Sequence, residues 1–446
     1  MTIQPLRLPS MKILLISNIF PPEVWGGYEL LAEDIALQLR EAGHDVRVLT
    51  SEASQNDPRP WVERSLELTY PFQNRGREPR FRHLYLARQH RLALQKTLEE
   101  FPAHVALIFS LRRLGVHLAH ALQARELPCV YCLNDLWPLD FTPNFSSFLA
   151  RRKPSQSSTP SLPKVGKLRR TLQYLRPQEF LWPKPGIRRA IIVSQFLASR
   201  LKTGGLVIRA PRICYQGIRV AEFTKRAGGN PNADDSALSP PKKRGSEAHR
   251  KQKPLRLLSC GRIHPSKGIE FCLSTLQKLH AQNYSARLTI IGTGSAAYLR
   301  ELADLSVNLG ISQSVDFLGA MPRRDLAKQY ARHDVFIFAP RWEEPLGLTY
   351  LEAFACSLPV VARPTGGSRE LLLHRHNSLI ARNSPEAARQ IRELQVRPLV
   401  RRRLIAGGHA TLQDTANLNN YATAIEEELR KAQSDHLAER ENHWNP

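Results

Sequence analysis

The sequence lacks an apolar segment long enough to cross a bilayer, which takes roughly 18–20 residues. Near the N-terminus the apolar run 13–16 is followed at once by Ser17 and Asn18, so it predicts a buried strand rather than a secretion signal. Cysteine is also scarce: the chain has 6, and the pair Cys129 and Cys132 has no second pair with which to complete a zinc site. These absences favour a cytoplasmic protein with reduced thiols.

Acidic residues are in short supply as well, with 40 Asp and Glu against 64 Lys and Arg and a formal net charge of +24. Between positions 151 and 189, eleven basic residues stand against a single acid, Glu179. Such a stretch suits an anionic partner, which could be a membrane surface, a nucleic acid or a charged substrate; the alternative is a solvated surface segment. Because the arginines are not interleaved with aromatic residues that could stack on bases, we expect no nucleic-acid partner.

Short apolar runs alternate with amphipathic stretches through the first half of the chain, the pattern of βαβ units around a parallel sheet. A helix is predicted at 28–42, directly after Gly26 and Gly27. Strands are predicted at 12–17, 46–50, 104–110, 129–133 and 190–194. We place the first domain at residues 1–223, with a basic insertion at 141–185 that is rich in Pro, Ser, Lys and Arg.

Residues 224–254 contain almost no apolar side chains, which predicts a flexible linker. Strands are then predicted at 255–259, 287–292, 315–318, 335–338 and 359–362. We expect a second domain at 255–415 and a C-terminal segment, 416–446, that contains a helix crossing back to the first domain. The predicted fold class is α/β, with two Rossmann-like domains that face each other across a cleft lined by the carboxyl ends of their strands.

The stretch 340–370 carries two carboxylates, Glu344 and Glu352, eight positions apart. Pro345 suits the first turn of a helix, and Gly347 lets the backbone come close to a ligand. If the helix begins there, both carboxylates lie on nearly the same face, and the free N–H groups at its start form an anion site. The layout suits a ligand with a central diphosphate and hydroxyls at both ends, such as a nucleotide sugar.

This stretch resembles the donor-site signature of the family-4 retaining glycosyltransferases, which have the GT-B fold and are also called glycosyl transferases group 1. Their pattern runs Glu-Pro-Phe-Gly, Leu-Glu-Ala-Met-Ala, Gly-x-Pro-Val-Val-Ala and Gly-Gly-x-x-Glu. The chain departs from it at Leu346, Phe354 and Ser357. Ser357 replaces the usual Gly, which bears on activity if that turn needs a positive φ.

The resemblance assigns the donor site to the second domain. It implies that Glu344 contacts the donor-sugar hydroxyls at the catalytic centre and that Glu352 holds the ribose hydroxyls. Arg262 and Lys267, in the loop 261–268, match a cationic pair that would stabilise the leaving diphosphate. The backbone N–H groups at Gly347 and Leu348 would bind the same diphosphate.

Three further positions match the family more loosely. Gly27 lies in a glycine loop that faces the donor phosphates and the acceptor in the family, and Gly294 lies in a loop beside the nucleobase. Asp135 follows a predicted strand and, by resemblance, lies near the acceptor as a catalytic residue; its alternative role is a helix cap. No Asp-x-Asp motif occurs here, so we expect no essential metal and no cofactor.

The sequence thus predicts a glycosyltransferase that moves a sugar from a UDP- or GDP-linked donor to a saccharide or lipid-linked acceptor, in the synthesis of cell-envelope glycans or exopolysaccharide. The first domain would bind the acceptor, and its basic insertion would contact the anionic inner face of the membrane. Two alternatives remain open. One is a GT-B relative that binds nucleotide sugar without turnover, and the other is a basic nucleic-acid-binding protein.

Overall fold

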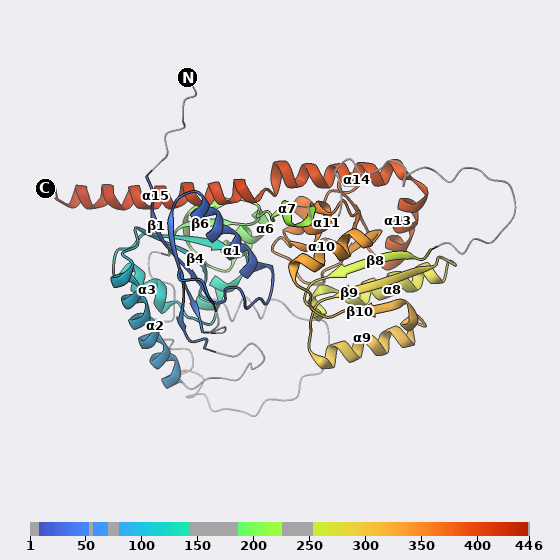
Figure 1. Cartoon of the computed structure of the whole chain (residues 1–446), viewed down its shortest axis with the longest axis horizontal. Coiled ribbons are helices and arrows are strands. Elements are labelled where there is room, and N and C mark those ends of the chain that lie inside the picture. The colour runs from blue at the N-terminus through green and yellow to red at the C-terminus, as the bar shows by residue number, and fades with distance from the viewer. Residues whose placement is uncertain (1–8, 53–56, 70–79, 143–185, 225–252, 445–446) are drawn as a thin grey trace, which may run out of the picture. The chain divides into compact units, whose positions relative to one another are not determined.

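A computed structural model of the chain describes residues 9–52, 57–69, 80–142, 186–224 and 253–444 (Figure 1). The chain divides into two compact units: Met1–Cys214 with Ala422–Pro446 form the first, and Tyr215–Tyr421 form the second. The division after Cys214 precedes the expected boundary at residue 223. The expected basic insertion and linker lie almost wholly outside the described residues, so the membrane contact expected of the insertion stays a prediction.

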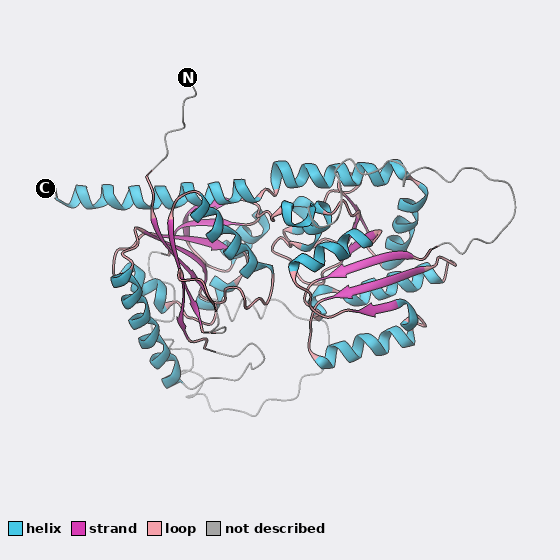
Figure 2. Ribbon diagram, in the orientation of Figure 1, coloured by secondary structure: helices cyan, strands magenta, loops and turns pink. Residues whose placement is uncertain are grey.

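The first unit is built on a seven-stranded parallel sheet in the order β3-β2-β1-β4-β5-β6-β7 (Figure 2). Its strands are β1 (Lys12–Ser17), β2 (Asp45–Ser51), β3 (Val62–Leu66), β4 (Val105–Ser110), β5 (Cys129–Leu133), β6 (Ile187–Ile192) and β7 (Ile208–Ile213). Its helices include α1 (Gly27–Glu41), α2 (Arg80–Glu100), α3 (His117–Gln123), the 3-10 turn η1 (Trp137–Phe141) and α6 (Gln195–Thr203). Every residue of β4 is buried, as in a strand covered by helices on both faces.

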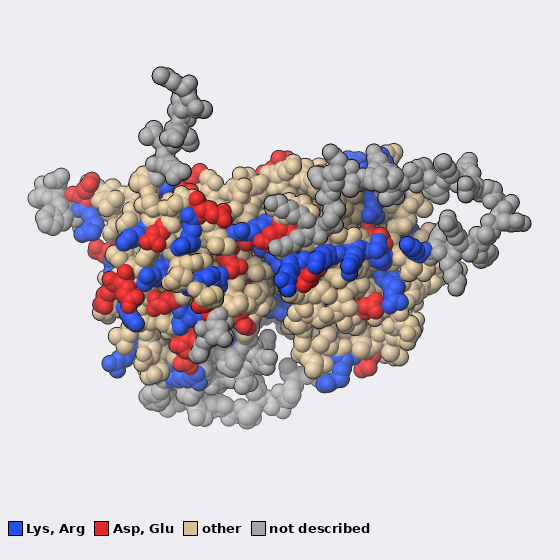
Figure 3. All heavy atoms as spheres, in the orientation of Figure 1, with Lys and Arg blue, Asp and Glu red and all other residues tan. Residues whose placement is uncertain are grey.

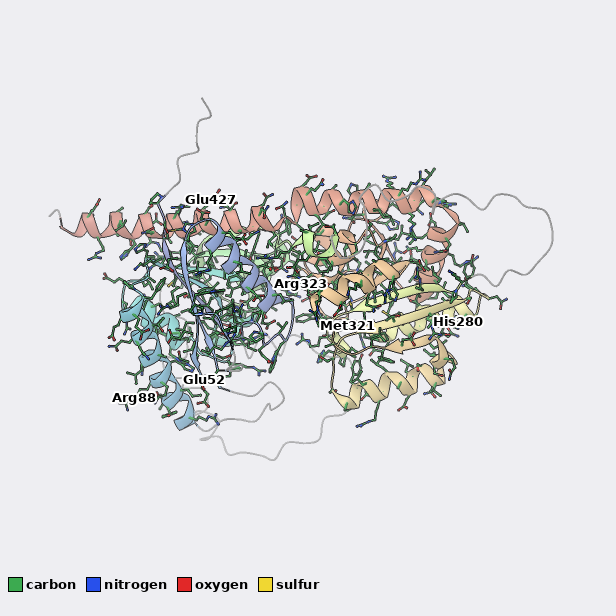
Figure 4. All side chains as sticks on the ribbon, viewed as in Figure 1. Glu52, Arg88, His280, Met321, Arg323 and Glu427 are labelled. Atoms are coloured by element: carbon green, nitrogen blue, oxygen red, sulfur yellow. The ribbon has the colours of Figure 1, made fainter. Side chains whose placement is uncertain are left out.

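The C-terminal helix α15 (Leu418–Trp444) begins in the second unit and belongs to the first from Ala422 onward. Arg189 on β6 pairs with Glu428 at 2.8 Å and with Asp435 at 2.7 Å. Arg212 on β7 pairs with Glu427, which Figure 4 labels, at 2.6 Å. These ion pairs hold α15 against β6 and β7. None of the helices in the described ranges is both long enough and apolar enough to span a membrane.

The second unit has a six-stranded parallel sheet in the order β10-β9-β8-β11-β12-β13. Its strands are β8 (Leu255–Cys260), β9 (Ala286–Ile291), β10 (Val315–Phe317), β11 (Val335–Phe338), β12 (Val360–Ala362) and β13 (Ser378–Ile380). Its helices are α7 (Val220–Thr224), α8 (Ile269–His280), α9 (Ala296–Asn308), α10 (Arg323–Arg332), α11 (Thr349–Ala355), α12 (Ser368–Leu371), α13 (Ser384–Val396) and α14 (Pro398–Ala410). Short 3-10 turns are η4 (Pro265–Lys267) and η5 (Ser312–Ser314), and a π-helical turn, η6, spans Thr411–Thr415.

Alternation along β8 directs side chains to both faces of this sheet. Leu257 joins the core that α8, α9 and α13 cover. Cys260, at the end of the strand, lies beside Tyr330 of α10 and Glu352 of α11, and burial raises the pKa of its thiol. Helices therefore cover both faces of the sheet. Cys260, Tyr330 and Glu352 lie on the face that α10 and α11 cover.

Helix α11 ends at Ala355 with Cys356 as its C-cap, and the next residue, Ser357, has a positive φ of 54°. The Ser357 N–H donates to the Phe354 carbonyl at 3.0 Å and the Leu358 N–H to the Ala353 carbonyl at 2.9 Å, a helix end that usually has glycine. The Ser357 hydroxyl lies 3.0 Å from Nε2 of His409 on α14. The turn does need a positive φ, and the chain adopts it with serine.

Replacing Ser357 with glycine should raise the free energy of unfolding by about 1 kcal/mol, because a non-glycine residue in this region costs roughly 1–2 kcal/mol. Urea denaturation followed by circular dichroism measures the change. Ser357→Ala is the control, since it keeps the strain and loses the hydroxyl contact, and it should be less stable than the wild type. A Ser357→Gly variant less stable than the wild type would show that the contact with His409 outweighs the strain.

Candidate functional site

The polar residues singled out in the second half of the sequence gather at the carboxyl ends of four neighbouring strands of the second unit. The loops are 261–268 after β8, 292–295 after β9, 339–348 after β11 and 363–367 after β12. Parallel strands bring their carboxyl ends to one edge of a sheet, where ligands of open α/β folds bind. This edge is therefore the candidate site.

The loops after β8 and β9 run side by side in close backbone contact. The Gly261 N–H donates to the Ile291 carbonyl at 2.9 Å, and the Ile263 N–H donates to the Thr293 carbonyl at 2.7 Å. A Cβ on Gly294 would lie 2.2 Å from the Ile263 carbonyl oxygen, which leaves no room for a side chain. Gly294 is thus required by packing, and its contact with a nucleobase stays a prediction.

Lys267 reaches from the loop after β8 to Glu344 in the loop after β11, with Nζ 2.6 Å from Oε2. It ends the 3-10 turn η4, which begins where the His264 ring nitrogen Nδ1 accepts a hydrogen bond from the Ser266 N–H at 3.2 Å. Arg262, in the same loop, has an exposed side chain. The structure joins Lys267 and Glu344 directly and leaves the Arg262 guanidinium at the surface of the loop.

Glu344 is only 7% exposed, and its carboxylate is held by two donors. Besides Lys267, the indole N–H of Trp342 donates to Oε2 at 2.7 Å. The Glu344 backbone N–H donates to the Thr365 hydroxyl at 3.3 Å, and the Glu344 carbonyl accepts from the Gly367 N–H at 2.8 Å. Loops from β8, β11 and β12 therefore converge on this one residue.

The expected helix start at Pro345 is wrong. Helix α11 begins at Thr349, because Gly347 takes a φ of +94° and turns the chain out of a helical path. A Cβ on Gly347 would lie 3.1 Å from the Tyr350 ring, so the backbone packs directly on that ring. Leu348 is the N-cap residue and makes no side-chain cap.

The two carboxylates consequently do not share a helix face as expected. Glu352 lies in α11, is 8% exposed and accepts a hydrogen bond from the Tyr330 hydroxyl at 2.8 Å. Burial raises the pKa of Glu352, and the Tyr330 hydrogen bond and the charge of Arg323 offset part of that rise. Arg323 begins α10, just after Met321 in the loop that follows β10, and Figure 4 labels both.

Several residues of this region were not anticipated from the sequence. Tyr215 donates to Glu370 Oε2 at 2.9 Å, and burial together with this hydrogen bond raises the pKa of Tyr215 to about 12. Tyr350 is fully buried, and its hydroxyl has no hydrogen-bond partner among the described residues. Aromatic residues such as these resemble ordinary core positions in a sequence, so only the structure shows the hydrogen bond from Tyr215 to Glu370 and the burial of the Tyr350 hydroxyl.

The remaining predicted residues lie in the first unit. Gly27 is the first residue of α1, and the N–H of the preceding Gly26 donates to Glu29 Oε2 at 2.9 Å. Asp135 accepts a hydrogen bond from the Trp137 N–H at 2.7 Å and pairs with Arg112 at 3.2 Å. Asp135 therefore accepts a hydrogen bond from the first residue of η1 without being its N-cap, which is Leu136, and its catalytic role stays a prediction.

Basic side chains form a row on the face of the second unit where α10 lies (Figure 3). The helix carries Arg323, Arg324, Lys328 and Arg332. Within the described ranges, no three His, Cys, Asp or Glu side chains come together in a way that could hold a metal ion. The expectation of a reaction without an essential metal stays a prediction.

Glu352→Gln should raise the free energy of unfolding at neutral pH by about 1 kcal/mol, the scale of single stabilising substitutions. The pKa of Glu352 is raised in the folded protein, so protonation of its carboxyl group favours the folded state. This contribution to stability is fully present below about pH 4.5 and is lost as pH rises through the raised pKa. A glutamine side chain keeps an oxygen that can accept the hydrogen bond from Tyr330 and stays uncharged at every pH.

Thermal denaturation between about pH 5 and 8 measures this difference, which should widen as pH rises. Glu301→Gln, on the exposed surface of α9, is the matched control and should leave the pH profile unchanged. A Glu352→Gln variant less stable than the wild type throughout this range would contradict the prediction.

Family comparisons identify both halves of the chain. Residues 241–409 match the family model described as glycosyl transferases group 1, and residues 26–159 match the model described as glycosyl transferase 4-like domain. The first match contains all of the candidate site, including Lys267, Glu344 and Glu352.

Curated relatives align over shorter segments. The chain is 36% identical over 124 residues to an uncharacterized glycosyltransferase of Methanocaldococcus jannaschii, covering 28% of this chain and 30% of that protein. It is 35% identical over 118 residues to a GDP-mannose-dependent phosphatidylinositol monomannoside mannosyltransferase of Mycolicibacterium smegmatis, covering 25% and 30%. It is 34% identical over 182 residues to a D-inositol 3-phosphate glycosyltransferase of Stackebrandtia nassauensis, covering 37% and 41%. The matches thus span less than half the length of these relatives.

Solved structures match nearly the full length of the chain. HepE of Anabaena, solved in complex with UDP and glucose, matches with a TM-score of 0.66 and 19% identity, covering 94% of this chain and 100% of that one. Sucrose-phosphate synthase of Thermosynechococcus elongatus matches with a TM-score of 0.66 and 17% identity, covering 95% and 100%. The fold predicted from the sequence, with two Rossmann-like units of the GT-B class, is confirmed.

Proposed function

Since the chain belongs to the glycosyl transferases group 1 family, we propose that it is a retaining glycosyltransferase that uses a UDP- or GDP-linked sugar. The observation that carries the proposal is the Lys267–Glu344 pair at the carboxyl edge of the second sheet. The acceptor is a saccharide or a lipid-linked saccharide, and the product serves cell-envelope glycan or exopolysaccharide synthesis. The name of the mycobacterial relative, a mannosyltransferase that acts on a phosphatidylinositol mannoside, supports this acceptor class.

Each charged residue of the candidate site has one part in this reaction. Lys267 and Arg262 bind the diphosphate and stabilise the negative charge that grows on it as the bond to the sugar breaks. Lys267 pairs with Glu344, so an incoming diphosphate competes with this carboxylate for a cation that already lies at the site. Backbone N–H groups at Gly347 and Leu348 add donors to the same phosphate oxygens.

The two carboxylates recognise hydroxyl groups at opposite ends of the donor. Glu344 accepts hydrogen bonds from the transferred sugar, and Glu352 accepts them from the ribose. Glu352 is suited to a neutral hydroxyl partner, because it is buried and its pKa is raised. A charge-assisted hydrogen bond of this kind contributes roughly 1.5–3 kcal/mol.

The transfer step needs no protein base. The bond between the sugar anomeric carbon and the leaving phosphate oxygen breaks, and the acceptor oxygen forms a bond to that carbon on the same face. The acceptor proton passes to the leaving phosphate oxygen, so charge and protons balance. Asp135, with Gly27, belongs to the acceptor side in this scheme, and the pairing of Asp135 with Arg112 suits a residue that positions rather than deprotonates.

A screen of the purified protein against UDP- and GDP-linked sugars, read out as released nucleoside diphosphate, tests the proposal. Release from one donor, stimulated by a saccharide acceptor and with the anomeric configuration retained, supports it. Tight nucleotide-sugar binding without release would favour the non-catalytic alternative. Binding of DNA or RNA that weakens steeply with salt, with no affinity for nucleoside diphosphates, would favour the nucleic-acid alternative.

Lys267→Ala and Arg262→Ala should each lower turnover by roughly 10²–10³-fold, as the loss of other preorganised charge-stabilising donors does. Initial rates at saturating donor measure the effect, with melting temperature as the test of folding. The matched control is Arg397→Ala, whose side chain pairs with Glu393 on α13 and should leave the rate unchanged. Folded variants with near wild-type rates would remove these two residues from the proposed mechanism.

A further inference from the structure

Trp342 has a place in the candidate site that the family signature does not explain. Its indole N–H donates to Glu344 Oε2 at 2.7 Å, and the Lys267 ammonium lies 5.3 Å from its ring centroid as well as 2.6 Å from the same carboxylate oxygen. The side chains of Lys267, Trp342 and Glu344 thus each contact the other two. The Trp342 indole interacts with both charged groups, because its N–H donates to the Glu344 carboxylate and its ring lies against the Lys267 ammonium.

The backbone of Trp342 is held from two directions. Its N–H donates to the Ser266 carbonyl at 3.3 Å, in the loop after β8. Its carbonyl accepts a hydrogen bond from the Thr365 hydroxyl, in the loop after β12. With both its donor and its acceptor engaged, the residue presents its indole from a backbone segment that has little freedom to move.

The two oxygens of Glu344 are used unequally. Oε2 takes both Lys267 and Trp342, while no described residue donates a hydrogen bond to Oε1. Removal of either donor would leave the buried Glu344 carboxylate with a single hydrogen-bond donor. In the proposed function, Lys267 is the donor that leaves, because the diphosphate needs it.

We propose that Trp342 is a positioning residue that sets the affinity for the sugar part of the donor. When Lys267 turns to the diphosphate, the Trp342 N–H stays on Oε2 and holds the Glu344 carboxylate in place. Oε1 is then directed toward a sugar hydroxyl. The inference rests on the proposed function, because it takes the ligand of Glu344 to be the sugar of a nucleotide sugar.

The decisive variant is Trp342→Phe, which keeps an aromatic ring beside Lys267 and removes only the indole N–H donor. Isothermal titration of the full-length protein gives the affinities for the nucleoside diphosphate and for the nucleotide sugar. The variant should bind the nucleotide sugar about 10- to 100-fold more weakly, the effect of losing a hydrogen bond to a charged group. Its affinity for the nucleoside diphosphate alone should fall by a smaller factor. Departure of Lys267 then leaves Glu344 without a donor whichever ligand binds, but only the nucleotide sugar also needs the carboxylate held in position.

A double-mutant cycle separates a positioning role from a general structural one. In a Glu344→Ala background, Trp342→Phe should have no further effect on nucleotide-sugar affinity, because the carboxylate through which it acts is gone. Tyr284→Phe is the matched control. It removes one aromatic hydroxyl from a residue of the same unit that packs under Arg392, and it should change neither affinity.

Three results would overturn the inference. The first is a Trp342→Phe variant that binds the nucleotide sugar as the wild type does. The second is an equal loss of affinity for both ligands, and the third is a loss that persists in the Glu344→Ala background. A wild-type protein that binds no nucleoside diphosphate at all would instead refute the proposed function, so the two failures are distinguishable.

Discussion

The candidate site depends on one buried carboxylate oxygen, Oε2 of Glu344, and on the two donors that share it. Lys267 comes from the loop after β8, and Trp342 precedes Glu344 in the loop after β11. The backbone of Glu344 is held in turn by Thr365 and Gly367, after β12. Three loops that are distant in the sequence are joined at this point, so the geometry of the whole edge follows from satisfying one buried charge.

The close approach of the neighbouring loops is the second constraint. Gly292 and Gly294 allow the backbone after β9 to run directly against the backbone after β8, because a Cβ at either position would lie within about 2 Å of a carbonyl oxygen. This contact fixes the loop that contains Arg262 and leads to Lys267. Gly292 and Gly294 therefore have a packing role that any ligand contact would add to.

Buried polar groups at this edge of the sheet lower the stability of the folded protein. Glu352 is held in a position where burial raises its pKa. The fully buried hydroxyl of Tyr350 has no partner among the described residues. Such departures from the most stable choice commonly collect at functional sites, where the chain is selected for ligand contacts rather than for stability alone.

Much of the architecture could be predicted from local pattern. The central strands appear as short apolar runs, because a parallel strand covered by helices on both faces is buried throughout. The edge strands β3 and β7 were not predicted. β7 alternates half-buried and exposed positions and includes Pro211, which an edge strand tolerates, so it shows no apolar run. The short strand β13 was not predicted either, because it has only two apolar residues, Leu379 and Ile380, after Ser378.

The sequence by itself determined the two parallel-sheet units, the family resemblance and the identity of the charged residues, because apolar periodicity and short motifs are local properties of the chain. Tertiary structure alone decided which of those residues meet. Lys267 and Glu344 are 77 positions apart and Tyr330 and Glu352 are 22 apart, and no local pattern reports such contacts. It also decided that α11 starts at Thr349 and not at Pro345, because Gly347 takes a positive φ where its backbone packs against the ring of Phe338 in β11.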